Sequence, residues 1–235
     1  MNKKVPIVYE DDDIIVCEKP AGMPVQSDKT RDMDLQTTLK QHIFLRQDSD
    51  KEPYLEAVHR LDRPVGGLMV FARTKESAAR LNRQIQNNEF EKYYQAVVCG
   101  TPPAESGTLE DYLKKDGRNN VTRIADKGEA GAKYAVLDYE LIDQIETKDG
   151  VYSWLLIILH TGRHHQIRVQ FAGRKMPLYG DTKYNPAFQN VKKTYMQLGL
   201  YSTRLSFNHP VTGEKLVFKT EPRGAAFDMM DVEAY

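Results

Sequence analysis

The pattern of apolar positions divides the chain into many short extended segments and a few helical ones. The run at 14–19 predicts a strand, which Pro20-Ala21-Gly22 closes as a turn. Further extended segments are predicted at 67–73, 92–98, 133–142, 151–160, 195–207 and 215–219. Helical spacing of the apolar residues predicts helices at 33–46, at 75–87 after a capping Thr74, and near 164–173.

Strands outnumber helices in this prediction, and the two do not alternate regularly. The pattern therefore favours an α+β fold with a mixed, mainly antiparallel sheet and flanking helices. No repeat or low-complexity linker divides the 235 residues. We expect a single domain over 1–235 that ends in an acidic C-terminal tail at 223–235.

The composition is that of a water-soluble globular protein, with 40% hydrophobic and 28% charged residues. The longest apolar run, 155–159, is too short to cross a bilayer, and no secretory signal is recognisable. Cys17 and Cys99 each lie in an apolar run, so we expect buried thiols and not a disulfide. These features predict a cytoplasmic protein without membrane contact, and the lack of an interface signature favours a monomer.

The formal net charge is zero, but the charges are unevenly distributed. Residues 160–223 carry 11 lysines and arginines against 3 acids, a net charge of +8. A polyanion would prefer this basic segment, because each cation that meets a phosphate releases condensed counterions. A solvated basic face explains the charge alone equally well.

The segment 59–68 has the highest density of reactive groups. Asp62 lies between Arg60 and Arg63, and the following Pro64-Val65-Gly66-Gly67 predicts an irregular loop. A carboxylate beside arginines stays ionised and can act as a nucleophile or a base. Taken alone, the segment fits a structural ion-pair network better than a catalytic site.

The segment 159–168 predicts an anion site. A strand there runs into a Thr-Gly turn, a helix begins near His164, and Arg163 adds positive charge beside the N–H groups of the helix start. His160, His164 and His165 suggest a metal site, but no cysteine or carboxylate completes a ligand pattern. We therefore predict no metal.

The segment 90–96 places Tyr93 and Tyr94 on opposite faces of a strand, so one tyrosine can enter a cleft. Such a tyrosine could stack on a nucleobase or transfer a proton, although strand tyrosines usually pack in the core. Motifs for nucleotide or zinc cofactors are not found in the sequence, and no cofactor is predicted.

Taken in order, these clusters resemble the motifs of the RluA-type pseudouridine synthases, and the match spans residues 7–222. It is carried by Lys19-Pro20-Ala21-Gly22, His59-Arg60-Leu61-Asp62-Arg63, Lys92-Tyr93-Tyr94-Gln95-Ala96, Thr161-Gly162-Arg163-His164-His165-Gln166-Ile167-Arg168, Gly180-Asp181 and His209-Pro210. Several ordered motifs are much harder to meet by chance than one.

The resemblance implies a single pseudouridine-synthase-like domain with a central catalytic cleft that receives a flipped uridine. It implies an isomerase, an intramolecular transferase that needs no cofactor. The C–N glycosidic bond breaks, the uracil turns, and a C–C bond forms at the same ribose carbon. The expected partner is structured RNA, ribosomal or transfer, read mainly by its shape and phosphates.

The resemblance also implies roles for single residues. Asp62 is the catalytic aspartate, Arg168 pairs with it and keeps it ionised, and Tyr94 lies against the uracil and assists proton transfer. Arg60 helps to displace the target base. The remaining residues expected to bind the RNA are His59, Arg63, Arg163, His165, Lys192 and Lys193.

Three positions depart from the family pattern. Pro64-Val65-Gly66-Gly67 stands where a Thr-Ser-Gly often follows a variable pair, and Gln170 stands where a histidine is common. The Lys-Pro-Ala-Gly element arrives by residue 19, so we expect no preceding S4-like RNA-binding domain.

Two other functions fit parts of the pattern. A non-catalytic RNA-binding or RNA-folding protein could keep the fold, but it would not need Asp62, Tyr94 and Arg168 together. A carboxylate-dependent glycosidase or a nuclease would need a second placed carboxylate or metal ligands, which no motif supplies.

Overall fold

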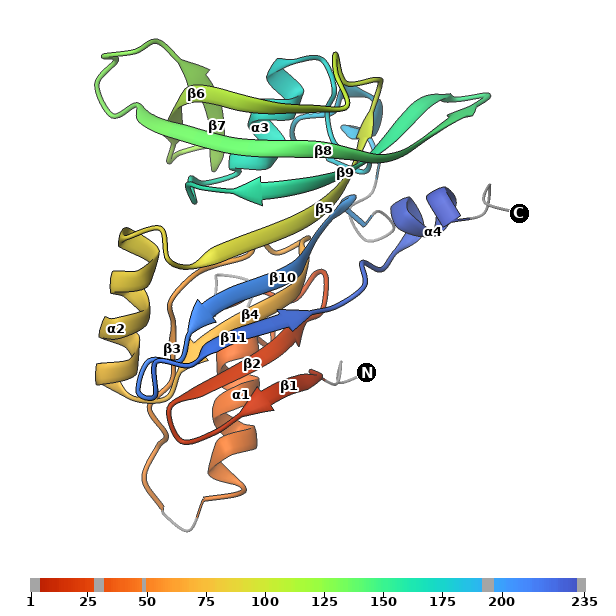
Figure 1. The fold of residues 1–235 in the computed structure, drawn as a ribbon. Helices are drawn as coiled ribbons and strands as arrows, with labels where there is room; N and C mark the ends of the chain where they lie inside the picture. Colours follow the sequence, from red (N-terminus) through yellow and green to blue (C-terminus); the bar gives the residue numbers. More distant parts are fainter. Residues whose placement is uncertain (1–4, 28–31, 48–49, 192–196, 232–235) are drawn as a thin grey trace. The chain divides into compact units, whose positions relative to one another are not determined.

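The computed structural model describes residues 5–27, 32–47, 50–191 and 197–231. Its helices and strands confirm the predicted α+β class (Figure 1). The chain divides into two compact units. The first unit contains Met1–Glu91 and Ser202–Glu221, and the second contains Lys92–Tyr201 and Pro222–Tyr235.

The first unit is a sheet with two helices. Its elements are β1 (Ile7–Glu10), β2 (Ile14–Lys19), α1 (Leu35–Phe44), β3 (Glu56–Ala57), β4 (Gly66–Ala72), α2 (Lys75–Gln86), most of β10 (Leu200–Asn208) and β11 (Lys215–Lys219). The strand order is β1-β2-β4-β10, with β11 beside β10 and β3 beside β4. All residues of β2 and β4 are buried, which is why these strands appear in the sequence as continuous apolar runs.

Local sequence signals explain two features of the first unit. The hydroxyl of Thr74 accepts a hydrogen bond from the backbone N–H of Ser77 at 3.0 Å, so the predicted cap of α2 is confirmed. Gly67 in β4 has a φ of +115°, and a Cβ there would lie 2.2 Å from the carbonyl oxygen of Ser202. Only glycine allows the backbones of β4 and β10 to approach so closely.

The second unit is an antiparallel sheet with two helices and a 3₁₀ turn. Its elements are β5 (Glu91–Cys99), β6 (Ser106–Asp116), β7 (Val121–Ala125), β8 (Lys133–Thr147), β9 (Gly150–Leu159), α3 (Gln166–Gly173), η1 (Pro186–Phe188) and α4 (Ala225–Asp231). The strand order is β5-β9-β8-β6-β7, and all neighbouring strands pair antiparallel.

The structure contains elements that the sequence pattern did not predict. The strands β1, β3, β6 and β7 were missed, and β8 extends five residues beyond the predicted end at residue 142. Helix α4 lies within the predicted acidic tail and buries Ala226, Phe227 and Met230 in an apolar cluster with Val97. The tail is therefore partly a packed helix, because its few apolar residues find partners that are distant in sequence.

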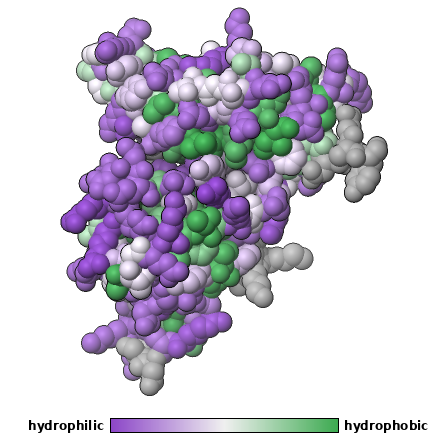
Figure 2. Space-filling model, in the orientation of Figure 1, coloured by the Kyte–Doolittle hydropathy of each residue, from purple (hydrophilic) through white to green (hydrophobic). Residues whose placement is uncertain are grey.

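The surface seen in Figure 2 is mainly hydrophilic, with smaller apolar patches. No helix in the described ranges is long and apolar enough to cross a membrane. The cysteines are free thiols, Cys17 fully buried and Cys99 partly so, and burial raises the pKa of both.

Candidate functional site

Asp62 lies half-buried in the loop of residues 58–65, here called the aspartate loop, between β3 and β4. The carbonyl oxygen of Asp62 accepts the N–H of Val65 at 3.0 Å, which closes a tight turn directly after the carboxylate-bearing residue. The predicted irregular loop is therefore present as far as Val65, whereas Gly66 and Gly67, which were also expected in it, begin β4.

A fully buried lysine connects this loop to the preceding turn. Nζ of Lys19 donates to the carbonyl oxygens of Pro20, Met23 and Arg63, at 3.1, 2.8 and 3.1 Å. The backbone N–H of Gly22 also donates to the Arg63 carbonyl, at 2.8 Å. The Lys-Pro-Ala-Gly turn and the aspartate loop are thus tied together by bonds in the interior of the first unit, where an amide or ammonium must be hydrogen-bonded.

The other polar residues of the aspartate loop differ in exposure. His59 is half-buried, and its Nε2 accepts the N–H of Val70 at 3.2 Å, so its proton is on Nδ1. Arg60 and Arg63 are exposed, and Arg63 forms an ion pair with Asp32 at the surface. The two arginines are accessible to a ligand, whereas His59 supports the loop from β4. Their RNA-binding roles stay predictions.

In the second unit, Tyr94 lies in β5 with its side chain buried, opposite Ile157 of β9. Burial alternates along this strand: Lys92, Tyr94 and Ala96 are buried, and Tyr93 between them is only partly so. The prediction that the two tyrosines face opposite ways is confirmed.

The start of α3 is held by a glutamine side chain. Oε1 of Gln166 accepts the N–H of Arg163 at 3.0 Å and the hydroxyl of Thr161 at 2.8 Å, and its Nε2 donates to the carbonyl of Val136 at 3.1 Å. His165, the residue before the helix, takes a left-handed φ of 53°. These bonds fix the turn between β9 and the N-terminus of α3.

Arg168 of α3 is buried and forms a two-point ion pair with a partner that the sequence analysis did not assign. Its Nε and Nη2 donate to the two carboxylate oxygens of Asp181, at 2.8 and 2.7 Å. The same carboxylate accepts the N–H groups of Lys183 and Tyr184, and the guanidinium lies 5.1 Å above the Tyr184 ring. The bonds to Asp181 therefore fix the position and the plane of the guanidinium.

The sequence analysis includes Gly180-Asp181 among the family motifs but assigns Asp181 no partner, and two features of the sequence bear on its role. It is one of 3 acids among 11 basic residues in 160–223, and it follows Gly180. Gly180 has a φ of +72°, and a Cβ there would lie 2.5 Å from the carbonyl of Gln197. The glycine therefore allows the turn that presents Asp181 to Arg168.

The three histidines near α3 have different hydrogen-bond partners, although the rings of His164 and His165 stack with their centroids 3.7 Å apart. His160 bonds Asp138, His164 bonds Thr122 and Asn120, and His165 bonds the Tyr184 hydroxyl, at 2.6 to 3.0 Å. Desolvation, followed by the charge of Arg168, lowers the pKa of His165 to about 2. His165 is therefore neutral, and any bond that it makes to RNA would be uncharged.

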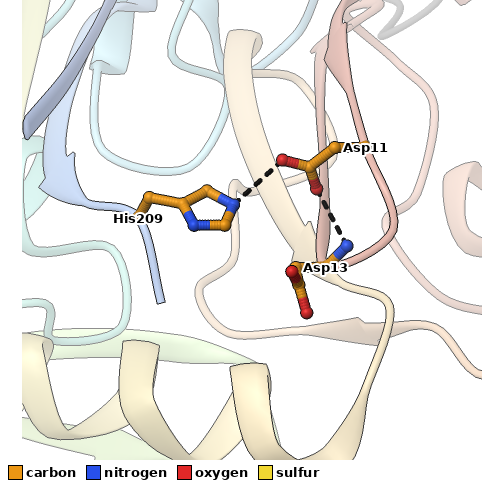
Figure 3. Close-up of side chains that lie close together, drawn as sticks. All are labelled: Asp11, Asp13 and His209. Atoms are coloured by element: carbon orange, nitrogen blue, oxygen red, sulfur yellow. Dashed lines mark hydrogen bonds and ion pairs between the residues drawn. The ribbon is translucent and has the colours of Figure 1, made fainter. Parts of the chain in front are cut away.

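Asp11, Asp13 and His209 lie close enough to one another to hold a metal ion (Figure 3). Nδ1 of His209 accepts the N–H groups of Val211 and Thr212, so its proton is on Nε2, which donates to Asp11 at 2.9 Å. A metal at Nε2 would have to displace that proton.

The Asp11 carboxylate is also fully engaged. It accepts the N–H groups of Asp13 and Ile14, each at 2.8 Å, and the hydroxyl of Tyr9 at 2.7 Å, besides His209. Burial would raise the pKa of Asp11, but these hydrogen bonds outweigh it and lower the pKa. We therefore assign the cluster a structural role, in which it joins the β1–β2 turn to the β10–β11 turn.

The remaining predicted RNA-binding residues lie in or after the α3 turn. Arg163 is exposed, and its Nε donates to the carbonyl of Tyr134 at 2.8 Å. Lys192 and Lys193 lie outside the described residues. The structure therefore places Asp62, His59, Arg60 and Arg63 in the first unit, and Tyr94, Arg163, His165 and Arg168 in the second.

Comparison with known proteins identifies the family. A family model described as RNA pseudouridylate synthase matches residues 13–173. The ribosomal large subunit pseudouridine synthase D of Vibrio cholerae is 36% identical over 227 residues, covering 90% of this chain and 65% of that protein. The tRNA pseudouridine synthase C of Haemophilus ducreyi is 33% identical, covering 89% of this chain and 88% of that protein. The chain belongs to the RNA pseudouridylate synthase family.

Solved structures agree with this fold. The human RNA pseudouridylate synthase domain containing 4 superposes with a TM-score of 0.76 at 21% identity, covering 97% of this chain and 92% of that one. The human RNA pseudouridylate synthase domain containing 1 superposes with a TM-score of 0.72 at 21% identity, covering 93% of this chain and 84% of that one. The predicted pseudouridine-synthase-like fold is confirmed.

Proposed function

We propose that this protein is an RNA pseudouridine synthase that isomerises specific uridines in structured RNA without a cofactor. The observation that carries the proposal is the aspartate loop. Asp62 lies within the region that the family model matches, half-exposed, in a loop that a hydrogen bond from the buried Lys19 to the Arg63 carbonyl holds in place. A catalytic carboxylate needs such a fixed yet accessible position.

In the proposed reaction, the ionised Asp62 acts at the ribose as nucleophile or base while the glycosidic C–N bond breaks. The uracil turns against Tyr94, which assists proton transfer, and the C–C bond then forms at the same ribose carbon. Arg168 keeps Asp62 ionised. Its two bonds to Asp181 hold the guanidinium in one fixed orientation.

We propose structured ribosomal or transfer RNA as the substrate. The relatives' names refer to the ribosomal large subunit and to tRNA. The charge of +8 over 160–223 suits a polyanion, and the exposed Arg60 would help to displace the target base. We further propose that the protein acts as a monomer in the cytoplasm.

Pseudouridine mapping tests the proposal. Total RNA is incubated with the wild-type protein or with Asp62→Asn, treated with carbodiimide, and read by primer extension. We expect stops in ribosomal or transfer RNA that appear only with the wild type. If a folded protein that binds RNA produced no stop, the non-catalytic RNA-binding function would replace the proposed one.

The basic segment should supply much of the RNA affinity. Replacing Arg163, Lys192 and Lys193 with Ala is expected to weaken RNA binding. The slope of log K against the logarithm of the salt concentration should become shallower by about 0.7–0.9 for each phosphate that the variant no longer neutralises. Filter binding at several salt concentrations measures the slope. The matched control replaces the exposed Lys51, Lys75 and Lys148, which lie outside the segment, and should leave the slope unchanged. Equal slopes for both triple variants would contradict the prediction.

A further inference from the structure

Lys92 is a buried lysine to which the described residues supply no counter-charge. It begins the second unit, in β5, and is 7% exposed. Across the described ranges, no hydrogen bond or ion pair to its ammonium is found, in contrast to the buried Lys19 with its three carbonyl partners. Burying a lysine whose ammonium has no partner is unfavourable, and an anionic ligand would offset that cost.

The electrostatics agree with this geometry. Burial lowers the pKa of Lys92, and no neighbouring charge opposes that shift. A carboxylate close to Nζ would have raised the pKa. Among the residues that the structure describes, no acid therefore offsets the cost of burying this lysine.

The ammonium lies beside the turn that precedes α3. A Cβ on Gly162 would come within 3.8 Å of Nζ, so the glycine keeps the space next to the ammonium open. Gln166 fixes this turn, and the exposed Arg163 follows. The N-terminus of α3 adds partial positive charge and N–H donors, which attract anions.

The position of Tyr94 shows how far the Lys92 ammonium lies from the uracil in the proposed reaction. Lys92 and Tyr94 are two residues apart on the same face of β5, roughly 7 Å along the strand. A nucleotide spans a comparable distance between its base and its phosphates. An RNA whose uracil met Tyr94 would bring a phosphate within reach of Lys92.

We propose that the ammonium of Lys92, with the Gly162 turn, binds a phosphodiester of the RNA next to the uridine that meets Tyr94. The inference rests on the proposed function, since it takes RNA as the ligand. A phosphate suits the site better than a uracil carbonyl, because only an anion compensates the buried charge and makes charge-assisted hydrogen bonds.

Lys92→Met removes the charge but keeps the length of the side chain. Without RNA, we expect its thermal midpoint to equal or exceed that of the wild type, because a desolvated charge is lost. With RNA, affinity should fall about 10- to 100-fold, the range for one hydrogen bond to a charged group. A residue with a merely structural role would lower the midpoint and leave affinity unchanged.

Lys114→Met is the matched control. Lys114 is also a strand lysine of the second unit, but its Nζ bonds Glu129 at 2.9 Å. Its replacement should leave RNA affinity unchanged. Gly162→Ala is a second variant that keeps the charge and fills the space beside it; we expect weaker RNA binding with an unchanged thermal midpoint.

Inorganic phosphate, titrated at constant ionic strength, probes the site without RNA. The midpoint should rise with phosphate in the wild type and in Lys114→Met, and should rise less in Lys92→Met. Equal phosphate responses in all three proteins, or a lower midpoint for Lys92→Met without ligand, would overturn the assignment. If the wild type formed no pseudouridine yet the phosphate response depended on Lys92, the proposed function would fail and the anion site would stand.

Discussion

Asp62→Asn is expected to reduce the rate of pseudouridine formation by about 10⁴-fold or more, because it removes a group that acts directly on the reacting bonds. The substitution keeps the size of the side chain and removes its negative charge and basicity. Single-turnover kinetics with RNA tritiated at uracil C5, the carbon that forms the new bond, would measure the rate as tritium release.

The Asp62→Asn substitution should lower the rate of the reaction and leave folding and RNA binding nearly unchanged. The backbone turn from Asp62 to Val65 and the buried bonds of Lys19 do not use the Asp62 side chain. The variant should therefore keep its unfolding midpoint and bind RNA within a few-fold of the wild type. Asp12→Asn, the same exchange at an exposed turn of the first unit, should keep full activity. A rate for Asp62→Asn within tenfold of the control would remove Asp62 from its proposed role.

The second large effect concerns stability. Asp181→Asn is expected to destabilise the protein by about 3–5 kcal/mol, the usual result of removing one partner from a buried ion pair. The Arg168 and Asp181 side chains are 4% and 0% exposed, so water cannot replace the lost carboxylate charge. Asparagine still offers an oxygen to the N–H groups of Lys183 and Tyr184, and the loss therefore reports mainly on the charge.

Urea unfolding followed by circular dichroism would measure this loss as a lower midpoint at an unchanged slope. Asp111→Asn is the matched control, because Asp111 pairs with Arg174, the residue that ends the same helix α3. That pair is more exposed, 30% for Arg174 and 12% for Asp111, and its loss should cost about 1 kcal/mol. Similar losses in the two variants would mean that burial does not set the strength of the Arg168 pair.

The candidate site was only partly visible in the sequence. Ordered motifs brought out Asp62, Tyr94 and Arg168, and the alternation in β5 correctly predicted that Tyr93 and Tyr94 face opposite ways. The ion pair of Arg168 with Asp181 was missed, because the two residues lie in different elements and no local pattern links them. Lys92 belongs to a recognisable motif, but its burial became apparent only in the folded chain.

The sequence by itself determined the elements whose signals are local. The apolar run at 14–19 and the Thr74 cap each act within a few residues, and each appears in the structure where it was expected. The α+β class followed from the balance of these elements. Hydrophobic periodicity and capping depend on neighbours along the chain, which is why the sequence reveals them.

Only the tertiary structure decided which distant groups meet. Lys19 supports the aspartate loop through a carbonyl 44 positions away, and α4 is held by apolar side chains of β5 and the β8–β9 hairpin. The pairing of Asp181 with Arg168 and the burial of Lys92 likewise depend on packing between distant segments. Burial is a property of the packed chain, and it turns ordinary lysines, aspartates and arginines into the desolvated or paired groups of a site.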